Sequence, residues 1–326
     1  MKTLVEGFPK QLQEALGIAN KAVLTKKNNV HNILITGLGG SGIGGSILFD
    51  LIKNECAVPI LVNKDYTLPE FVNAHTLVIV SSYSGNTEET ISALKHAISK
   101  KAQVVCITSG GKIKELAIEN NFDIILIPGG NPPRSCIGYS LVQLLKIIQF
   151  NEFVKTDLLS QVSSSITLLN QENNFIKTEA AKIAQLLVNK ITVIYSLGSS
   201  EGVAIRFRQQ INENSKLLCW HHTLPEMNHN ELVGWTHKND ELAVVTFKTS
   251  FDFDRTQKRY EICKPIFTKY SSSVTEINAK GITLLEQFIY LINIGDWISC
   301  YIADLRNIDA TEVDVITKLK SELEKF

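Results

Sequence analysis

The sequence has no surplus of charge of either sign. Its 326 residues carry 33 basic and 33 acidic side chains, so the formal net charge is zero. A chain without a basic excess is not electrostatically predisposed to bind nucleic acid or an anionic membrane surface. We therefore expect neither a nucleic acid nor a membrane as a partner.

Paired cysteines and long apolar runs are missing as well. None of the six cysteines is at C-x-x-C spacing, which argues against a disulfide framework or a cysteine zinc site. No run approaches the roughly 18–20 apolar residues of a membrane helix. Residues 1–20 are amphipathic, which predicts no signal peptide. Together these absences predict a cytoplasmic protein.

Apolar runs of strand length alternate with stretches of helical spacing in the first half. The strands are predicted in the segments 32–40, 58–65, 76–85, 102–111 and 123–130, with helices at 46–55, 88–101 and 112–121. This alternation is typical of a parallel sheet wrapped by helices. Residues 2–25 predict a helix interrupted near Pro9, and residues 138–170 predict further helix.

The same order of elements returns in the second half. Segment 190–216 repeats the strand, Gly/Ser turn and helix of 31–55, and 241–250 resembles 76–85. A strand at 272–281 and an apolar helix at 282–302 follow. The sequence therefore predicts two copies of one α/β unit, as domains 1–153 and 154–326, packed tightly because no Gly/Ser-rich linker separates them.

Glycine is concentrated between residues 35 and 47. Gly37, Gly39 and Gly42 spell the dinucleotide-binding pattern G-x-G-x-x-G. That fingerprint needs an acidic residue about 20 positions later, whereas Asp65 follows the second strand well beyond this spacing. A tight strand-to-helix turn needs only one or two glycines, so the surplus beside Ser41 predicts a backbone that a ligand approaches.

Hydroxyl groups gather where the third predicted strand ends. Ser82, Ser84 and Thr87 lie directly before a helix that begins near Glu88. One hydroxyl is enough to cap a helix, and the free N–H groups of a helix N-terminus bind anions. The sequence therefore predicts a phosphate-binding loop at 82–87.

Five segments together resemble a known family: "GLGGSGIGG", "SSYSGNTEET", "NPPRSCIGYS" (131–140), "QINENSK" (210–216) and "LPEMNHNELVGW" (224–235). From about residue 31 to the C-terminus the chain resembles the sugar isomerase (SIS) domain, and more narrowly the bifunctional phosphoglucose/phosphomannose isomerases. The resemblance implies two SIS-type domains, each a flavodoxin-like three-layer sandwich, with the active site at their junction. It also implies a homodimer that converts glucose 6-phosphate, and mannose 6-phosphate, to fructose 6-phosphate without metal or organic cofactor.

The resemblance also implies a role for individual residues. Gly40 and Ser41 would contact the sugar; Ser82, Ser84 and Thr87 would hold its phosphate; Arg134 would lie beside the reacting carbons; Glu213 would transfer the proton; and His229 would open the ring from the other subunit. A threonine near Thr311 would leave room for the mannose epimer.

The last predicted helix, 313–326, would supply a catalytic lysine. The family pattern favours Lys320, and Lys318 remains an alternative. Val315, Ile316, Leu319 and Leu323 recur at helical spacing, which predicts that this face is buried.

Several plainer interpretations remain at this point. Glu213 could be a solvated helix residue, and Arg134 a loop arginine paired with a carboxylate. His221 and His222 compete with His229 for its role, and these histidines with His237 could bind a metal, although their spacing matches no familiar zinc site. A sugar-phosphate sensor without catalysis, or a nicotinamide enzyme using the glycine turn, would fit parts of the pattern.

Overall fold

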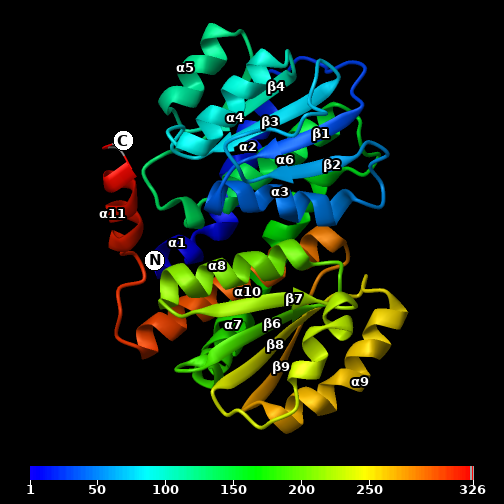
Figure 1. Ribbon diagram of the computed structural model, residues 1–326, viewed down its shortest axis with the longest axis vertical. Helices are drawn as coiled ribbons and strands as arrows, with labels where there is room; N and C mark the ends of the chain where they lie inside the picture. Colours follow the sequence, from blue (N-terminus) through cyan, green and yellow to red (C-terminus); the bar gives the residue numbers. More distant parts are fainter. Residues whose placement is uncertain (324, 326) are drawn as a thin grey trace.

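Two parallel sheets organise the part of the chain that the computed structural model describes, residues 1–323 and 325 (Figure 1). In the first sheet the strand order is β2-β1-β3-β4-β5. Its strands are β1 (Asn32–Thr36), β2 (Ile60–Asn63), β3 (Thr76–Ser82), β4 (Gln103–Thr108) and β5 (Asp123–Leu126). All five strands predicted in the first half are confirmed.

The second sheet has the order β7-β6-β8-β9. It contains β6 (Ile191–Ser196), β7 (Cys219–Thr223), β8 (Leu242–Lys248) and β9 (Ser273–Asn278). In each sheet the strand order reverses beside the first strand, between β1 and β3 and between β6 and β8. Loops at the carboxyl ends of such strands form the usual ligand site of an open parallel sheet, and the loops 37–41 and 82–87 occupy this position in the first sheet.

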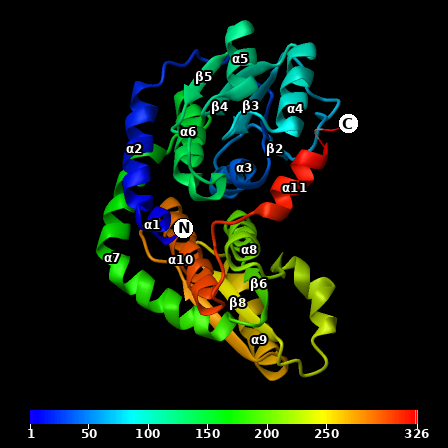
Figure 2. The same cartoon turned by 90° about the vertical axis from the view of Figure 1, so that its left-hand side faces the viewer.

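Helices cover both sheets and link them (Figures 1 and 2). They are α1 (Lys2–Glu6), α2 (Phe8–Lys21), α3 (Gly39–Ile52), α4 (Glu88–Ser99), α5 (Gly111–Glu119), α6 (Ile137–Phe150), α7 (Leu158–Leu187), α8 (Glu201–Ser215), α9 (Asp254–Tyr270), α10 (Leu284–Leu305) and α11 (Asp314–Leu323). Short 3-10 turns lie at η1 (Pro133–Ser135), η2 (Glu226–His229) and η3 (Glu231–Gly234). The N-terminal helices bridge the molecule, because α2 packs on α6 and α7 while α1 packs on α10.

Helices α3 and α8 join the two halves face to face (Figure 1). Gly202 permits this approach, because a Cβ there would lie 2.7 Å from the backbone nitrogen of Ile47. The buried carboxylate of Asp50 accepts a hydrogen bond of 2.6 Å from the N–H of Gly202. Lys53 donates to Asp50 at 2.9 Å and to the carbonyl of Gly198 at 2.9 Å. Polar side chains of one half therefore form hydrogen bonds with the backbone at the N-terminus of α8 in the other half.

Helix α10 is the most buried helix of the core. By length and composition alone it could cross a membrane, but 83% of its most apolar window is buried inside the protein. It packs against both α7 and α8. Its apolar character thus reflects a helix that contacts protein on most of its surface.

Several boundaries differ from the sequence prediction. Helix α3 begins at Gly39, within the glycine segment, rather than near residue 46. The predicted helix 138–170 is two helices, separated at 151–157, where Glu152 has a φ of 60° and the Asp157 side chain caps α7. The N-terminal break falls at Gly7, and Pro9 takes its favoured place in the first turn of α2.

The predicted buried face of the last helix is wrong for the single chain. Among its described residues α11 buries none, and Val315 and Leu319 are 83% and 60% exposed. Figure 1 shows α11 apart from both sheets, at the left side of the view. The prediction also covered Glu324 and Phe326, which lie outside the described residues. Helical periodicity identified an apolar face but could not say what covers it.

Candidate active site

The glycine loop after β1 is shaped first by contacts within the chain. A Cβ on Gly42 would collide with the carbonyl of Gly37. A Cβ on Gly40 would lie 2.9 Å from the backbone nitrogen of Arg134 and from the carbonyl carbon of Pro133. Part of the glycine surplus is therefore explained by η1 packing directly on α3, which brings Arg134 to this loop.

Ser41 ties the glycine loop to the end of β3. Its Oγ accepts a hydrogen bond from the N–H of Tyr83 at 2.9 Å, and its carbonyl accepts one from Ser81 Oγ at 3.0 Å. The hydroxyl of Tyr83 accepts a hydrogen bond from the N–H of Asn131 at 3.1 Å. The loop 82–87, the glycine loop and the segment before η1 are thus fixed to one another.

The hydroxyl loop leads into α4 as predicted. Ser82 is buried and its Oγ donates to Thr87 Oγ1 at 3.3 Å, whereas Ser84 is exposed. Thr87 is the N-cap residue, yet no side chain caps the first turn of α4. Gly85, with a φ of 72°, packs on the carbonyl of Gly110. The loop therefore has a fixed backbone, hydroxyl groups and a helix N-terminus, the combination that binds phosphate.

Arg134 lies in η1 and is 3% exposed. Its Nε donates to Asn214 Oδ1 at 2.8 Å, and its Nη2 donates to the carbonyls of Ala310 and Thr311 at 2.6 and 3.0 Å. Its Nη1 contacts Glu213 Oε2 at 3.4 Å. Burial lowers the pKa of Arg134, while the nearby Glu213 carboxylate opposes that shift. Four of the five N–H groups of this guanidinium point at protein, which leaves one on Nη1 for a ligand.

Glu213 and Asn214 reach Arg134 from the last turn of α8, in the other half of the molecule. The Glu213 side chain is 27% exposed, so a ligand can reach its carboxylate. Asn214 is fully buried, and its Nδ2 donates to Ser299 Oγ of α10 at 3.0 Å. Because one amide bonds both Arg134 and Ser299, the orientation of the guanidinium is fixed.

Lys216 and Arg306 close this end of α8. Lys216 takes the left-handed conformation that ends the helix, and its Nζ donates to the carbonyls of Glu213 and Glu312 at 2.6 and 2.5 Å. Arg306 donates to the carbonyls of Ser215 and Lys216. The segment 213–216 and the segment 310–312 are thereby joined around Arg134.

His229 lies away from this cluster in the same chain. Because β7 is parallel to β6, both strands end at the sheet edge from which α8 starts, where the N–H of Leu224 bonds the carbonyl of Ser196. From Glu201 to Glu213 the helix rises roughly 18 Å at about 1.5 Å per residue. His229 is exposed in η2 beyond β7. The structure therefore brings Arg134 and Glu213 together but leaves His229 at the far end of α8.

The lysines of α11 are exposed and lie beyond the segment that Arg134 binds. Lys318 and Lys320 are two residues apart, so they point to different sides of the helix. Thr311 is exposed at its side chain while its carbonyl accepts from Arg134. The chain leading to α11 is therefore fixed at the cluster, although the helix itself is not packed there.

The ring of His237 contacts Thr236 Oγ1 at 2.9 Å, whereas His221 and His222 lie in a separate polar cluster around Glu231. Its carboxylate accepts hydrogen bonds from Tyr195 at 2.5 Å, from Trp220 at 3.2 Å and from the ring of His222 at 2.8 Å. Burial, with nearby Arg208, lowers the pKa of His221 to about 4. Among residues 1–323 and 325, no group of three or more His, Cys, Asp or Glu side chains is arranged to hold a metal ion.

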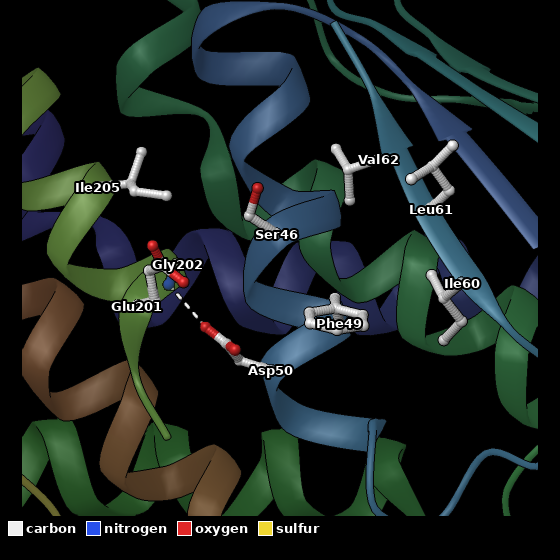
Figure 3. A pocket seen from close by; sticks show the side chains of 9 residues that line it. All are labelled: Ser46, Phe49, Asp50, Ile60, Leu61, Val62, Glu201, Gly202 and Ile205. Atoms are coloured by element: carbon white, nitrogen blue, oxygen red, sulfur yellow. Dashed lines mark hydrogen bonds between the residues drawn. The ribbon is translucent and has the colours of Figure 1, made fainter. Parts of the chain in front are cut away.

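A pocket of about 270 Å³ opens near the other end of the junction (Figure 3). Figure 3 shows Phe49, Ile60 and Ile205 lining it, with the hydrogen bond from Gly202 to Asp50 at one side. None of the predicted site residues lines it. Burial raises the pKa of Asp50, while its bonds to Gly202 and Lys53 oppose that shift. The pocket is a mostly apolar gap where the halves meet, away from Arg134.

Three contacts of the site were not predicted from the sequence. Asn214, Lys216 and the N–H of Tyr83 each fix a predicted site residue. Asn214 and Lys216 lie inside the motif "ENSK", so their position next to Glu213 was a sequence signal for a role in the site. Only the fold shows that Asn214 bonds Arg134 and that Lys216 bonds the segment before α11. The contact of Tyr83 is made by backbone and has no sequence signal.

Two parallel sheets are joined through α3 and α8, with a glycine loop and a hydroxyl loop at the carboxyl ends of the first sheet and an Arg–Glu pair across the junction. These features define a protein with two SIS-type units. The C-terminal domain of glucosamine-fructose-6-phosphate aminotransferase from Francisella tularensis has this fold, with a TM-score of 0.77 and 15% identity over 95% of this chain and 97% of that one. The family described as "Bacterial phospho-glucose isomerase C-terminal SIS domain" matches residues 176–323.

Curated relatives identify the family. The bifunctional phosphoglucose/phosphomannose isomerase of Caldicellulosiruptor bescii is 38% identical over 98% of this chain and 97% of its own. The protein of that name from Thermoplasma acidophilum is 36% identical over 90% of this chain and 89% of its own. The chain therefore belongs to the bifunctional phosphoglucose/phosphomannose isomerase family.

Proposed function

We propose that this protein interconverts glucose 6-phosphate, and also mannose 6-phosphate, with fructose 6-phosphate. The observation that carries the proposal is the contact between Arg134 of the first half and Glu213 of the second, at 3.4 Å and beside the glycine loop. A carboxylate that can move a proton and a fixed cation are the two groups that this isomerisation needs.

The two loops of the first sheet would hold the substrate. Ser82, Ser84, Thr87 and the first turn of α4 would bind the phosphate, and Gly40 and Ser41 would contact the sugar. Binding the phosphate end fixes the distance between the reacting carbons and Glu213, which lowers the entropic part of the barrier. Tight coupling of the two loops through Ser41 and Tyr83 supports this arrangement.

The chemistry begins with ring opening, in which a proton leaves one sugar oxygen and another is delivered to the ring oxygen. We assign this step to His229, because one nitrogen of a neutral imidazole accepts a proton while the other donates one. Glu213 then removes the proton from C2 of the aldose, and the electron pair forms the C1–C2 double bond of the enediolate while the C1 oxygen takes the negative charge. A proton passes from the hydroxyl on C2 to the oxygen on C1, and the same carboxyl returns its proton to C1 as the C2 carbonyl forms. The remaining N–H of Arg134 would stabilise the negative oxygen, a contribution typically worth about 3–4 kcal/mol.

We propose that the working form is a homodimer in which His229 enters the site of the partner subunit. Two observations support this. Glu213 and His229 lie at opposite ends of α8 in one chain, and the apolar face of α11 is exposed in the single chain. Lys320 of α11, with Lys318 as the alternative, would assist the chemistry once that helix is packed.

We also propose that the chain divides after residue 153 and works in the cytoplasm, without a cofactor. The division falls between α6 and α7, where the chain passes from one sheet to the other. The six cysteines are free, which suits a reducing compartment.

An enzyme assay tests the function. Purified protein is supplied with fructose 6-phosphate, and glucose 6-phosphate is followed with glucose-6-phosphate dehydrogenase; mannose 6-phosphate is supplied in a second series. We expect turnover in both. Folded dimer that turns over neither sugar would refute the proposal.

The base assignment has its own test. Glu213→Gln keeps the size of the side chain but removes the base, so we expect kcat to fall by about 10²–10⁴-fold. Glu179→Gln, a surface change on α7 far from the site, is the matched control. Full activity of Glu213→Gln would show that another group is the proton-transfer base.

A further inference from the structure

Arg206 is a buried cation that the proposed reaction does not use. It lies on α8, is 2% exposed, and its Nη2 donates to the backbone carbonyl of Arg134 at 3.0 Å. The same nitrogen donates to Asp296 Oδ2 of α10 at 2.6 Å. One side chain therefore connects the 3-10 turn that carries Arg134 with two helices of the other half.

The carboxylate of Asp296 is held on both sides. Its second oxygen accepts a hydrogen bond from Gln210 Nε2 at 2.9 Å, and the residue is 5% exposed. Gln210 and Arg206 are one turn apart on α8, so two side chains of α8 bind this carboxylate. Arg206 thus has a fixed counterion, and its direction toward Arg134 is set by α10.

The turn η1 is held at each of its three residues. Pro133 packs on Gly40, where a Cβ would lie 2.9 Å away. The carbonyl of Arg134 is bound by Arg206, and the carbonyl of Ser135 accepts from Gln11 Nε2 at 2.8 Å. Contacts from α3, α8 and α2 therefore place the backbone from which the Arg134 guanidinium extends.

Stability alone is a poor reason for such a pair. Replacing a buried ion pair by apolar side chains is often neutral or stabilising, because the desolvation of both charges offsets their attraction. A carbonyl that must be held inside the protein, in contrast, needs a buried donor. Arg206 supplies this donor to the residue whose guanidinium contacts Glu213.

We propose that Arg206, with Asp296 as its counterion, is a positioning residue for Arg134. The proposal rests on the isomerase function, because its kinetic effect acts through the role of Arg134 in that reaction. Loss of the pair lets η1 shift, so Arg134 no longer meets the enediolate oxygen, whereas the phosphate loop 82–87 still binds substrate.

A double-mutant cycle tests this role. Arg206→Met with Asp296→Asn removes both charges, and kcat is expected to fall on the order of 10–100-fold while KM changes less than about threefold. In an Arg134→Ala background the same pair of changes should cost nothing further in kcat. Equal losses in both backgrounds, or wild-type kcat in the folded variant, would overturn the proposal.

Arg206→Lys is the conservative variant. A lysine Nζ can donate to both acceptors from one nitrogen, as Nη2 of Arg206 does, so we expect it to recover most of the lost kcat. A lysine variant as slow as the Arg206→Met, Asp296→Asn protein, with the same fold by circular dichroism, would contradict the assignment. If that doubly substituted protein does not fold, Asp296→Asn alone takes its place in the cycle.

A substrate-free measurement separates this proposal from the isomerase function. The Arg134 Nε–H is bonded to Asn214 and gives a signal in a ¹⁵N-edited spectrum of labelled protein. We expect its hydrogen exchange to quicken at least about tenfold when Arg206 and Asp296 are replaced. Unchanged exchange in the folded variant would refute the positioning role even if the protein is an isomerase, and quicker exchange would support it even if no isomerase activity is found.

Discussion

Arg134 and Asn214 are joined across the two halves of the molecule by a hydrogen bond of 2.8 Å from Nε to Oδ1. The Asn214 amide is itself fixed, because its Nδ2 donates to Ser299 Oγ at 3.0 Å. The guanidinium is therefore oriented by the residue next to the proposed base, so α8 positions the base and the cation together.

This relationship predicts the effect of Asn214→Leu. The change keeps the branching of the side chain at Cγ but leaves the buried Nε–H of Arg134 without its acceptor, which costs about 1–3 kcal/mol of stability. We expect kcat for fructose 6-phosphate to fall on the order of 10–100-fold with a smaller change in KM. Steady-state kinetics and urea unfolding measure the two effects. Ser299→Ala, which removes the outer bond together with the bond from Ser299 Oγ to the carbonyl of Asp296, serves as the graded comparison. An Asn214→Leu protein with unaltered kcat would show that Arg134 does not need this contact.

Donation of His229 across a dimer is tested by complementation. Glu213→Gln and His229→Asn proteins are each expected to be inactive, but a mixed dimer restores one site with Glu213 from one chain and His229 from the other. After unfolding and refolding in equal amounts, half of the dimers are mixed and each has one intact site, so about a quarter of wild-type activity should return. If the two residues served one site within a chain, mixing would restore nothing.

The two lysines of α11 are distinguished by their helical positions. Residues two apart do not face the same way on a helix, so only one can reach the site. We expect Lys320→Ala to reduce kcat on the order of tenfold or more and Lys318→Ala to have little effect. The reverse result would assign the role to Lys318, and two fully active variants would remove α11 from the chemistry.

Acid sensitivity should depend on His221. Its folded pKa of about 4 lies below the ordinary value near 6.5. The unfolded chain therefore binds a proton in the window between these values and the folded protein does not, so stability is lost as the pH falls from about 6.5 toward 4. Groups that face His221 are Arg208, His222, Lys64, Glu201 and Glu231.

His221→Asn removes this titration. Between pH 7 and pH 5 the wild-type protein should lose about 2 kcal/mol more stability than the variant. Urea unfolding at fixed protein concentration at the two pH values measures the difference. Parallel losses in the two proteins would show that His221 titrates with its ordinary pKa in the fold.

Local patterns predicted most of the fold. All five strands of the first sheet were read from apolar runs and their glycine or hydroxyl ends, and β6, β8 and β9 from the same signals. β7 was missed because "CWHHT" is polar and lies at a sheet edge, so it lacks the apolar run of a buried strand. The start of α3 was missed because glycine is a poor helix former. Only the packing of β3 on Gly37, of η1 on Gly40 and of the Gly37 backbone on Gly42 shows why glycine is needed at this helix start.

The sequence by itself determined the residue types of the site: the hydroxyl loop 82–87, Arg134, and Glu213 in its family motif. These follow from local chemistry, since a helix N-terminus binds anions, a carboxylate accepts protons and a guanidinium carries a positive charge wherever they lie in a fold. Only the tertiary structure decided which of them meet. Arg134 reaches Glu213 and Asn214 because α3 and α8 pack through Gly202 and Asp50, whereas parallel pairing of β7 with β6 sends His229 to the other end of α8. Distances between segments far apart in the chain depend on packing, which no local pattern records.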